Sequence, residues 1–205
     1  LFPYTTLFRS RSFYRKYYHS GNCSVYISGK VTSEIIRCIE DNLGSGQWGE
    51  VTEKAKTMLV PPVTTKEKRI FIEREDALQS SLKMGCFVMD RHHPDFLKAR
   101  VMVTLFGGYF GSRLMSNIRE DKGYTYGIGA GIVSYPETGI LTVSTEAANE
   151  YVDSIITEVY REMDKLCNDL VPQEELEMVK NYMLGDLCRS YEGPFSLSDA
   201  WIYIE

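Results

Sequence analysis

The sequence predicts an α+β fold, with a largely antiparallel sheet and helices packed on one face. Three observations support this prediction. Segments in which apolar and polar residues alternate follow one another across a short turn. Amphipathic helical segments lie between and after them. No internal repeat is present. The length of 205 residues suits one ordinary domain with a sizeable core.

The first part of the chain is expected to form a helix, a strand and a second helix. Aromatic residues at helical spacing in 12–18 indicate the end of a helix, and the β-branched and aromatic segment 22–28 is typical of a strand. Thr32 or Ser33 can cap a following helix, which carries isoleucines at helical spacing and stops at Gly44.

The next part should supply a loop and two strands. Residues 45–68 contain glycines and prolines and are expected to form a surface connection, with a short extended piece at 58–60. Residues 69–74 and 79–89 alternate in polarity and predict strands, and the second of them places its apolar side chains on one face.

The remaining elements follow in order. A turn at 90–95 leads into an apolar helix at 96–106, which ends at a pair of glycines. Segments 124–135 and 139–145 form an antiparallel hairpin across a PETG turn. Three further helices are expected: one at 148–168, one from Pro172 to Gly193, and one from about Ser196 onward.

Both ends of the chain have unusual features. Residues 1–10 (LFPYTTLFRS) match the translation of a common sequencing adapter, so we expect residues 11–205 to be the natural single domain. An apolar pattern still continues at Trp201, Ile202 and Ile204 when the sequence stops. We therefore expect the natural protein to extend beyond both ends of this chain.

Charge and cysteine content narrow the function classes. The formal net charge is −5 and lysines and arginines alternate with acids, which argues against a nucleic-acid partner. The five cysteines are scattered and form no CxxC pair, which favours reduced thiols and a cytoplasmic location. No apolar run reaches the roughly 18 residues of a membrane span.

The sequence does not contain the motifs of several common classes of catalytic site. The histidines are His19, His92 and His93, and no HxxEH or HxxE-H arrangement surrounds them, so a surface turn is the better interpretation of the adjacent pair. The glycine-rich segment 107–113 lacks the lysine of a phosphate-binding loop and follows a helix. A tight bend between helices is therefore expected there. No GxSxG elbow is present.

Arg119 and Tyr126 are the candidate binding residues. Arg119 falls at the end of a short helical run, and Tyr126 follows Gly123 at the start of a strand. A guanidinium and a phenol can both donate hydrogen bonds to a peptide carbonyl, which is what a developing oxyanion needs. A surface ion pair and a core tyrosine remain the alternative, which spacing alone does not reject.

At these residues the chain resembles the C-terminal domain of the insulinase/pitrilysin/mitochondrial-processing-peptidase family of zinc metallopeptidases. The resemblance covers most of the chain from Ser12 onward. The matching segments are Gly107-Gly108, Ser112-Arg113-Leu114, Arg119-Glu120-Asp121-Lys122-Gly123-Tyr124-Thr125-Tyr126, the opening FYRKYYHSGNCSVYISG, and the HPDF turn.

The resemblance implies a metallohydrolase-like α+β domain of the mitochondrial-processing-peptidase type, from a bacterial protein. A complete enzyme of this family hydrolyses peptides with zinc held by an HxxEH motif in another domain. The last domain supplies an arginine and a tyrosine that hold the substrate backbone, and by position these are Arg119 and Tyr126. This chain has no HxxEH, so we expect it to bind no zinc, to contribute no catalytic residue and to be inactive alone.

Two arrangements of the missing zinc domain stay open. It can lie in the same polypeptide or on a heterodimer partner. A third interpretation is a non-catalytic structural or assembly subunit, related to the core proteins of a respiratory complex. Retention of both Arg119 and Tyr126 argues against that role, because a scaffold does not need the pair.

Overall fold

The computed structural model describes residues 4–44, 46, 48–49, 65–135 and 137–204. The chain forms two compact units, one made of Leu1–Ile70 with Cys188–Glu205 and the other of Phe71–Leu187. The extended piece expected at 58–60 lies outside the described residues. All five cysteines are free and exposed. No described helix has the length and apolar composition needed to cross a bilayer.

The first unit is helical in its described part. It contains α1 (Tyr4–Tyr17), α2 (Ser33–Ile39) and α6 (Pro194–Ile204), with short helical turns at η1 (Ser20–Asn22) and η2 (Glu40–Gly44). The cap expected for the second helix is confirmed, since the Thr32 hydroxyl accepts from the Ile35 amide at 3.4 Å.

Two strand predictions are wrong. Residues 22–28 and 69–74 belong to no strand of the structure. Their composition matches that of a strand, but β propensity describes how well a residue fits a paired, half-buried surface. In this chain neither segment has a ladder partner among the described residues, so the propensity alone does not make a strand.

The second unit contains an antiparallel sheet of three strands in the order β1-β3-β2. Its strands are β1 (Ser80–Val88), β2 (Thr125–Ser134) and β3 (Gly139–Ala147). The pairing of β1 with β3 is continuous, from Ser80 opposite Ala147 to Val88 opposite Gly139. The predicted hairpin of β2 and β3 is confirmed and is closed by a 2.8 Å bond from the Tyr135 amide to the Thr138 carbonyl.

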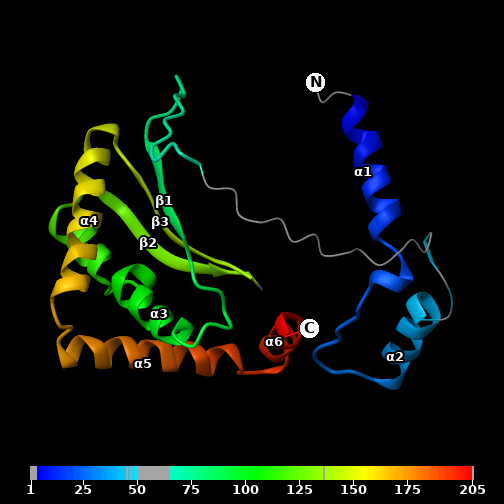
Figure 1. The fold of residues 1–205 in the computed structure, drawn as a ribbon. Helices are drawn as coiled ribbons and strands as arrows, with labels where there is room; N and C mark the ends of the chain where they lie inside the picture. The colour runs from blue at the N-terminus through cyan, green and yellow to red at the C-terminus, as the bar shows by residue number, and fades with distance from the viewer. Residues whose placement is uncertain (1–3, 45, 47, 50–64, 136, 205) are drawn as a thin grey trace. The chain divides into compact units, whose positions relative to one another are not determined.

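Helical segments cover one face of this sheet (Figure 1). They are α3 (Phe96–Val103), which continues as η3 (Thr104–Gly108), then η4 (Met115–Asp121) and α4 (Val152–Asn168), which follows the short turn η5 (Asn149–Tyr151). The helix α5 (Gln173–Ser190) packs against the 109–113 segment through Tyr182 and Glu175. Both η3 and η4 are π-helical turns. The predicted α+β class with helices on one face is therefore confirmed.

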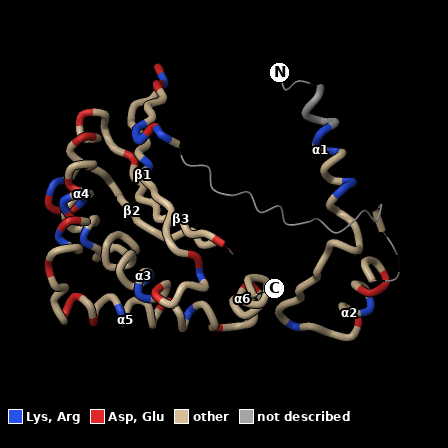
Figure 2. The backbone as a smooth tube through the Cα atoms, in the orientation of Figure 1, with Lys and Arg blue, Asp and Glu red and all other residues tan. Residues whose placement is uncertain are grey.

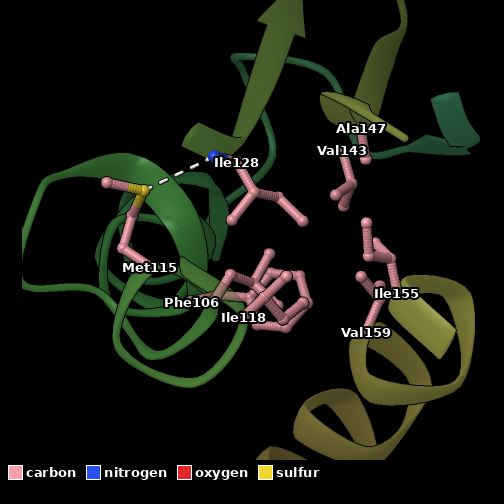
Figure 3. Packing of buried hydrophobic residues seen from close by; sticks show 9 residues of the cluster. Phe106, Met115, Ile118, Ile128, Val143, Ala147, Ile155 and Val159 are labelled. Atoms are coloured by element: carbon pink, nitrogen blue, oxygen red, sulfur yellow. Dashed lines mark hydrogen bonds between the residues drawn. The ribbon is translucent and has the colours of Figure 1, made fainter. Parts of the chain in front are cut away.

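The core of the second unit lies between the sheet and the helical segments. Figure 3 shows side chains from η3, η4 and α4 meeting those of β2 and β3. Its buried members are Phe106, Leu114, Met115, Ile118, Ile128, Val143, Ala147, Ile155 and Val159. The Ile128 amide also donates to the Met115 sulfur at 3.4 Å, which ties η4 directly to β2.

At Gly107 the backbone of η3 comes very close to β2. A Cβ atom at this position would lie 2.6 Å from the Ala130 Cβ and 2.7 Å from the Ala130 nitrogen. Both distances are well inside van der Waals contact, so any side chain would separate the helical turn from the sheet. Glycine is required at this position because no side chain fits between η3 and β2.

Substituting Gly107→Ala should therefore lower the free energy of unfolding by about 1–3 kcal/mol, because the new methyl group overlaps the Ala130 backbone. The matched control is Gly131→Ala in β2, next to Ala130, where an added Cβ atom would have no neighbour within 4 Å. Urea unfolding followed by circular dichroism measures both. Equal effects of the two substitutions would contradict the close approach.

Candidate functional site

The glycine-rich segment is a bend between two helical turns, as the sequence predicted. The chain leaves η3 at Gly108, and the Ser112 amide then bonds to the Tyr109 carbonyl at 3.1 Å. Tyr109 stacks on Tyr182 of α5 with 4.9 Å between the ring centroids. Burial raises the pKa of the Tyr109 phenol, and the nearby Glu175 carboxylate raises it further.

Arg113 anchors the far side of this bend. Its Nε and Nη2 atoms donate to the two carboxylate oxygens of Glu175, each at 2.8 Å. Paired hydrogen bonds of this kind hold a guanidinium and a carboxylate in one plane. The bond to Glu175 raises the pKa of the arginine, although partial burial opposes the shift. The bend is therefore joined to α5 by one aromatic and one ionic contact.

The segment η4 carries Arg119 and has an apolar side that fixes it to the core. Leu114 and Ile118 are fully buried beside it. The turn ends at Asp121, and Gly123 follows with a φ of 65°, which suits a glycine just after the end of a helix. The Tyr124 amide then bonds back to the Ile118 carbonyl at 3.0 Å, and the Tyr124 ring stacks on Tyr151. Arg119 thus stands one residue after a buried anchor.

Tyr126 lies at a β-bulge. Thr125 is opposite Ala147 and Ile128 is opposite Thr145, so the two residues Tyr126 and Gly127 share one position of β3. Bulges turn a side chain away from the regular alternation of a strand. The Tyr126 side chain is 91% exposed, whereas Ile128, two positions later, is buried.

The structure brings Arg119 and Tyr126 together. The guanidinium carbon of Arg119 lies 5.4 Å from the centroid of the Tyr126 ring and 4.5 Å from that of Phe110. Both distances are within the range of cation–π attraction. In the described part of the chain, no carboxylate lies within ion-pair distance of this guanidinium. The surface ion pair considered from the sequence is not formed, and Tyr126 is not a core residue.

This arrangement can donate hydrogen bonds to an oxygen atom. The aromatic contacts engage the flat guanidinium as a π-system partner, and its N–H groups project in its plane. The Tyr126 hydroxyl adds a neutral donor at the same exposed place. Carbonyl, carboxylate and oxyanion oxygens are the groups that such a pair can bind.

Three residues of this site were not predicted from the sequence. Phe110 lies in the glycine-rich bend, but only the folded chain brings its ring over Arg119. Thr125 and Thr145 bond to one another across the bulge, with 2.8 Å between their hydroxyl oxygens. In the sequence, the one sign that Thr125 belongs to the site is that it directly precedes Tyr126. That position does not reveal its partner Thr145, which lies twenty residues later.

The three histidines lie in other segments of the chain. His92 and His93 are exposed in the turn before α3, as predicted, and the Nδ1 atom of His93 accepts from the Asp95 amide. His19 is buried, and it belongs to the other unit. No three His, Cys, Asp or Glu side chains among the described residues are grouped so as to hold a metal ion. These residues do not fit a zinc site.

A second polar cluster joins η4 to α4. Asn117 donates to Glu158 at 3.1 Å and to Glu162 at 2.7 Å, and both glutamates are buried. Lys165 also donates to Glu162 at 2.7 Å, and Arg161 donates to Glu158 at 3.0 Å. Figure 2 shows basic and acidic residues interspersed along α4. The charges here balance one another and hold η4 in place.

Comparison with known families gives a match over most of the chain. A family model described as the Peptidase M16 inactive domain matches residues 6–183. An uncharacterized zinc protease of Bacillus subtilis, YmxG, is 25% identical over 182 residues, which are 89% of this chain and 43% of that protein. An uncharacterized zinc protease of Rickettsia felis is 26% identical over 88% of this chain and 42% of its own length. The chain thus spans less than half of these relatives.

Solved structures agree with the fold. A peptidase M16 inactive domain from Pseudomonas fluorescens has a TM-score of 0.51 and 27% identity over 53% of this chain and 27% of its own. A protease from Helicobacter pylori has a TM-score of 0.73 and 17% identity over 93% of this chain and 47% of its own. A chain of Complex III2 from Candida albicans has a TM-score of 0.61 and 16% identity, with coverages of 84% and 42%.

The Asn117 cluster leads to a prediction about stability. Substituting Asn117→Ala removes two hydrogen bonds to buried carboxylates and should lower the free energy of unfolding by roughly 1.5–3 kcal/mol. Asn117→Asp, although closer in shape, should destabilise more at neutral pH, because it places a third carboxylate beside Glu158 and Glu162. Chemical denaturation at pH 7 measures both.

The matched control is Asn168→Ala on α4, whose amide also contacts a carboxylate, that of Asp164, but at an exposed position. Its effect should stay within about 0.5 kcal/mol. An Asn117→Asp protein as stable as the original chain would show that Asn117 does not face two charged carboxylates.

Proposed function

Because the chain belongs to the Peptidase M16 inactive domain family, we propose that it is the substrate-binding, non-zinc half of a zinc metalloendopeptidase. In this role Arg119 and Tyr126 hold the backbone of a peptide substrate next to the bond that is cleaved. The activity itself requires a zinc-bearing HxxEH domain, which lies in the same polypeptide or on a heterodimer partner.

One observation carries the proposal. Arg119 and Tyr126 come from different elements, a π-helical turn and a β-bulge, and they meet at an exposed place with the guanidinium 5.4 Å from the ring. Irregular turns of both kinds are concentrated at functional sites. Two donors directed at one exposed place suit a peptide carbonyl that gains negative charge during hydrolysis.

The division of labour follows from what this chain contains. Its sequence has no HxxEH motif, and its described residues form no three-ligand metal cluster. Relatives named zinc proteases are more than twice as long as the part that this chain matches. We therefore assign zinc to the complementary domain of the complete protein, and derive from this chain only the binding and orientation of substrate.

The alternative function is a non-catalytic structural or assembly subunit. The fold likeness to a chain of Complex III2 favours it, but at 16% identity that likeness concerns the fold alone. An assembly subunit has no need for an exposed phenol held beside a guanidinium. It would also be recovered from its source as part of a large complex.

The proposal is tested by Tyr126→Phe and Arg119→Ala in the complete protein, with this chain joined to or mixed with its zinc-bearing domain. Loss of one donor to an oxyanion typically costs about 10²–10³ in rate, so kcat/KM for peptide cleavage should fall by that factor. The melting temperature of the Tyr126→Phe protein should not change, because the ring is 91% exposed.

Tyr160→Phe is the matched control, since it removes a phenol that is 60% exposed and belongs to α4, not to β2. It should leave kcat/KM unchanged. Wild-type kcat/KM in both the Tyr126→Phe and Arg119→Ala proteins would sink the peptidase proposal and favour the assembly subunit.

A further inference from the structure

We infer that Thr125 and Thr145 are positioning residues, whose hydroxyl groups lock the β-bulge that directs Tyr126 toward the substrate. The inference rests on the proposed function, because it assigns these threonines to the work of Tyr126. It adds two residues, one from each strand of the hairpin, that neither touch the substrate nor belong to the Arg119 and Tyr126 pair.

The exposure of Tyr126 shows why its direction must come from the backbone. A ring that is 91% exposed is not held by packing, and its one described contact is with the guanidinium of Arg119. The orientation of the Cα–Cβ bond is therefore the main constraint on where the hydroxyl points. That bond belongs to the bulge, where the regular ladder between β2 and β3 is interrupted.

Hydroxyl groups bond to the backbone at this interruption. The Thr145 hydroxyl reaches the Gly127 carbonyl at 2.8 Å, and the Thr125 hydroxyl reaches the Glu146 carbonyl at 2.6 Å. The Gly127 amide donates to the Thr125 oxygen at 3.2 Å. Gly127 directly follows Tyr126 in β2, and Glu146 lies opposite Tyr126 in β3. The hydroxyl groups therefore hold the backbone of both strands at the bulge.

Counting protons shows that the two hydroxyls act together. Each carries one hydrogen. If Thr125 donates to the Glu146 carbonyl, then its oxygen is free to accept from Thr145 at 2.8 Å and from the Gly127 amide. Thr145, which is only 6% exposed, then shares its proton between Thr125 and the Gly127 carbonyl. The Thr125 hydroxyl also lies 3.1 Å from the Gly127 carbonyl. Removing either hydroxyl therefore takes away hydrogen bonds that hold the backbone of the bulge.

The inference is tested in the complete protein by a double-mutant cycle between Thr145→Val and Tyr126→Phe. Valine keeps the shape of threonine and removes the hydroxyl. A shift of about 1 Å in a catalytic group can cost roughly 10²-fold, so Thr145→Val should lower kcat/KM by about ten- to a hundredfold. In the Tyr126→Phe background the same substitution should cost less than about twofold, because the hydroxyl that Thr145 positions is already absent.

Two further variants separate positioning from a general effect on the hairpin. Thr145→Ser keeps the hydroxyl and should retain nearly the original kcat/KM. Thr142→Val is the matched control, since Thr142 is also on β3 and its hydroxyl also reaches a carbonyl of β2, that of Gly131, at 3.4 Å but away from the bulge. It should leave kcat/KM unchanged, whatever its effect on the melting temperature.

The outcomes distinguish this inference from the proposed function. Equal losses from Thr145→Val in both backgrounds would overturn the positioning role and leave the role of Tyr126 intact. Wild-type kcat/KM of the Tyr126→Phe protein would overturn this inference, and it would overturn the proposed function as well only if the Arg119→Ala protein also kept wild-type kcat/KM. If Thr145→Val does not fold, Thr125→Val is carried through the same cycle with the same expectations, and Thr125→Ser replaces Thr145→Ser.

Discussion

The apolar contact of η4 with the hairpin of β2 and β3 determines the position of both candidate binding residues. Ile118 and Ile128 are buried in one cluster, and the Met115 sulfur accepts from the Ile128 amide. Arg119 directly follows Ile118, and Tyr126 stands two residues before Ile128. Because the core fixes the two isoleucines, the guanidinium and the phenol are held at adjacent points on the surface.

Polar contacts hold the same segment from its other sides. Arg113 bonds Glu175 with two hydrogen bonds, and Asn117 bridges the buried Glu158 and Glu162. Buried or half-buried carboxylates are stable only when they are paired, so these contacts depend on the bend and η4 keeping their course. The helical turn that carries Arg119 is thus held by the sheet below it, by α4 and by α5.

Irregular backbone produces the exposed part of the site. In a regular helix the buried residues recur about every 3.6 positions, and in a regular strand they recur every second position. The π-helical turn and the β-bulge each shift that alternation by local changes in hydrogen bonding. Here they leave Arg119 partly exposed beside the fully buried Ile118, and Tyr126 almost fully exposed two positions before the buried Ile128. Such a combination of a rigid support and an exposed donor is what binding a peptide backbone requires.

The sequence by itself determined the local elements of the second unit. The period-two pattern at 79–89, the hairpin at 124–145 and the amphipathic helix at 148–168 all lie within a few residues of their structural bounds, and Arg119 and Tyr126 were recognised as candidates. The tertiary structure decided the pairing: residues 22–28 and 69–74 remained outside the sheet, the bulge at Tyr126 broke the register, and Phe110 came over Arg119. The physical reason is range. Side-chain periodicity and turn chemistry act between neighbours in the chain, whereas strand partners, register and the Thr125–Thr145 contact depend on residues that meet only when the core forms.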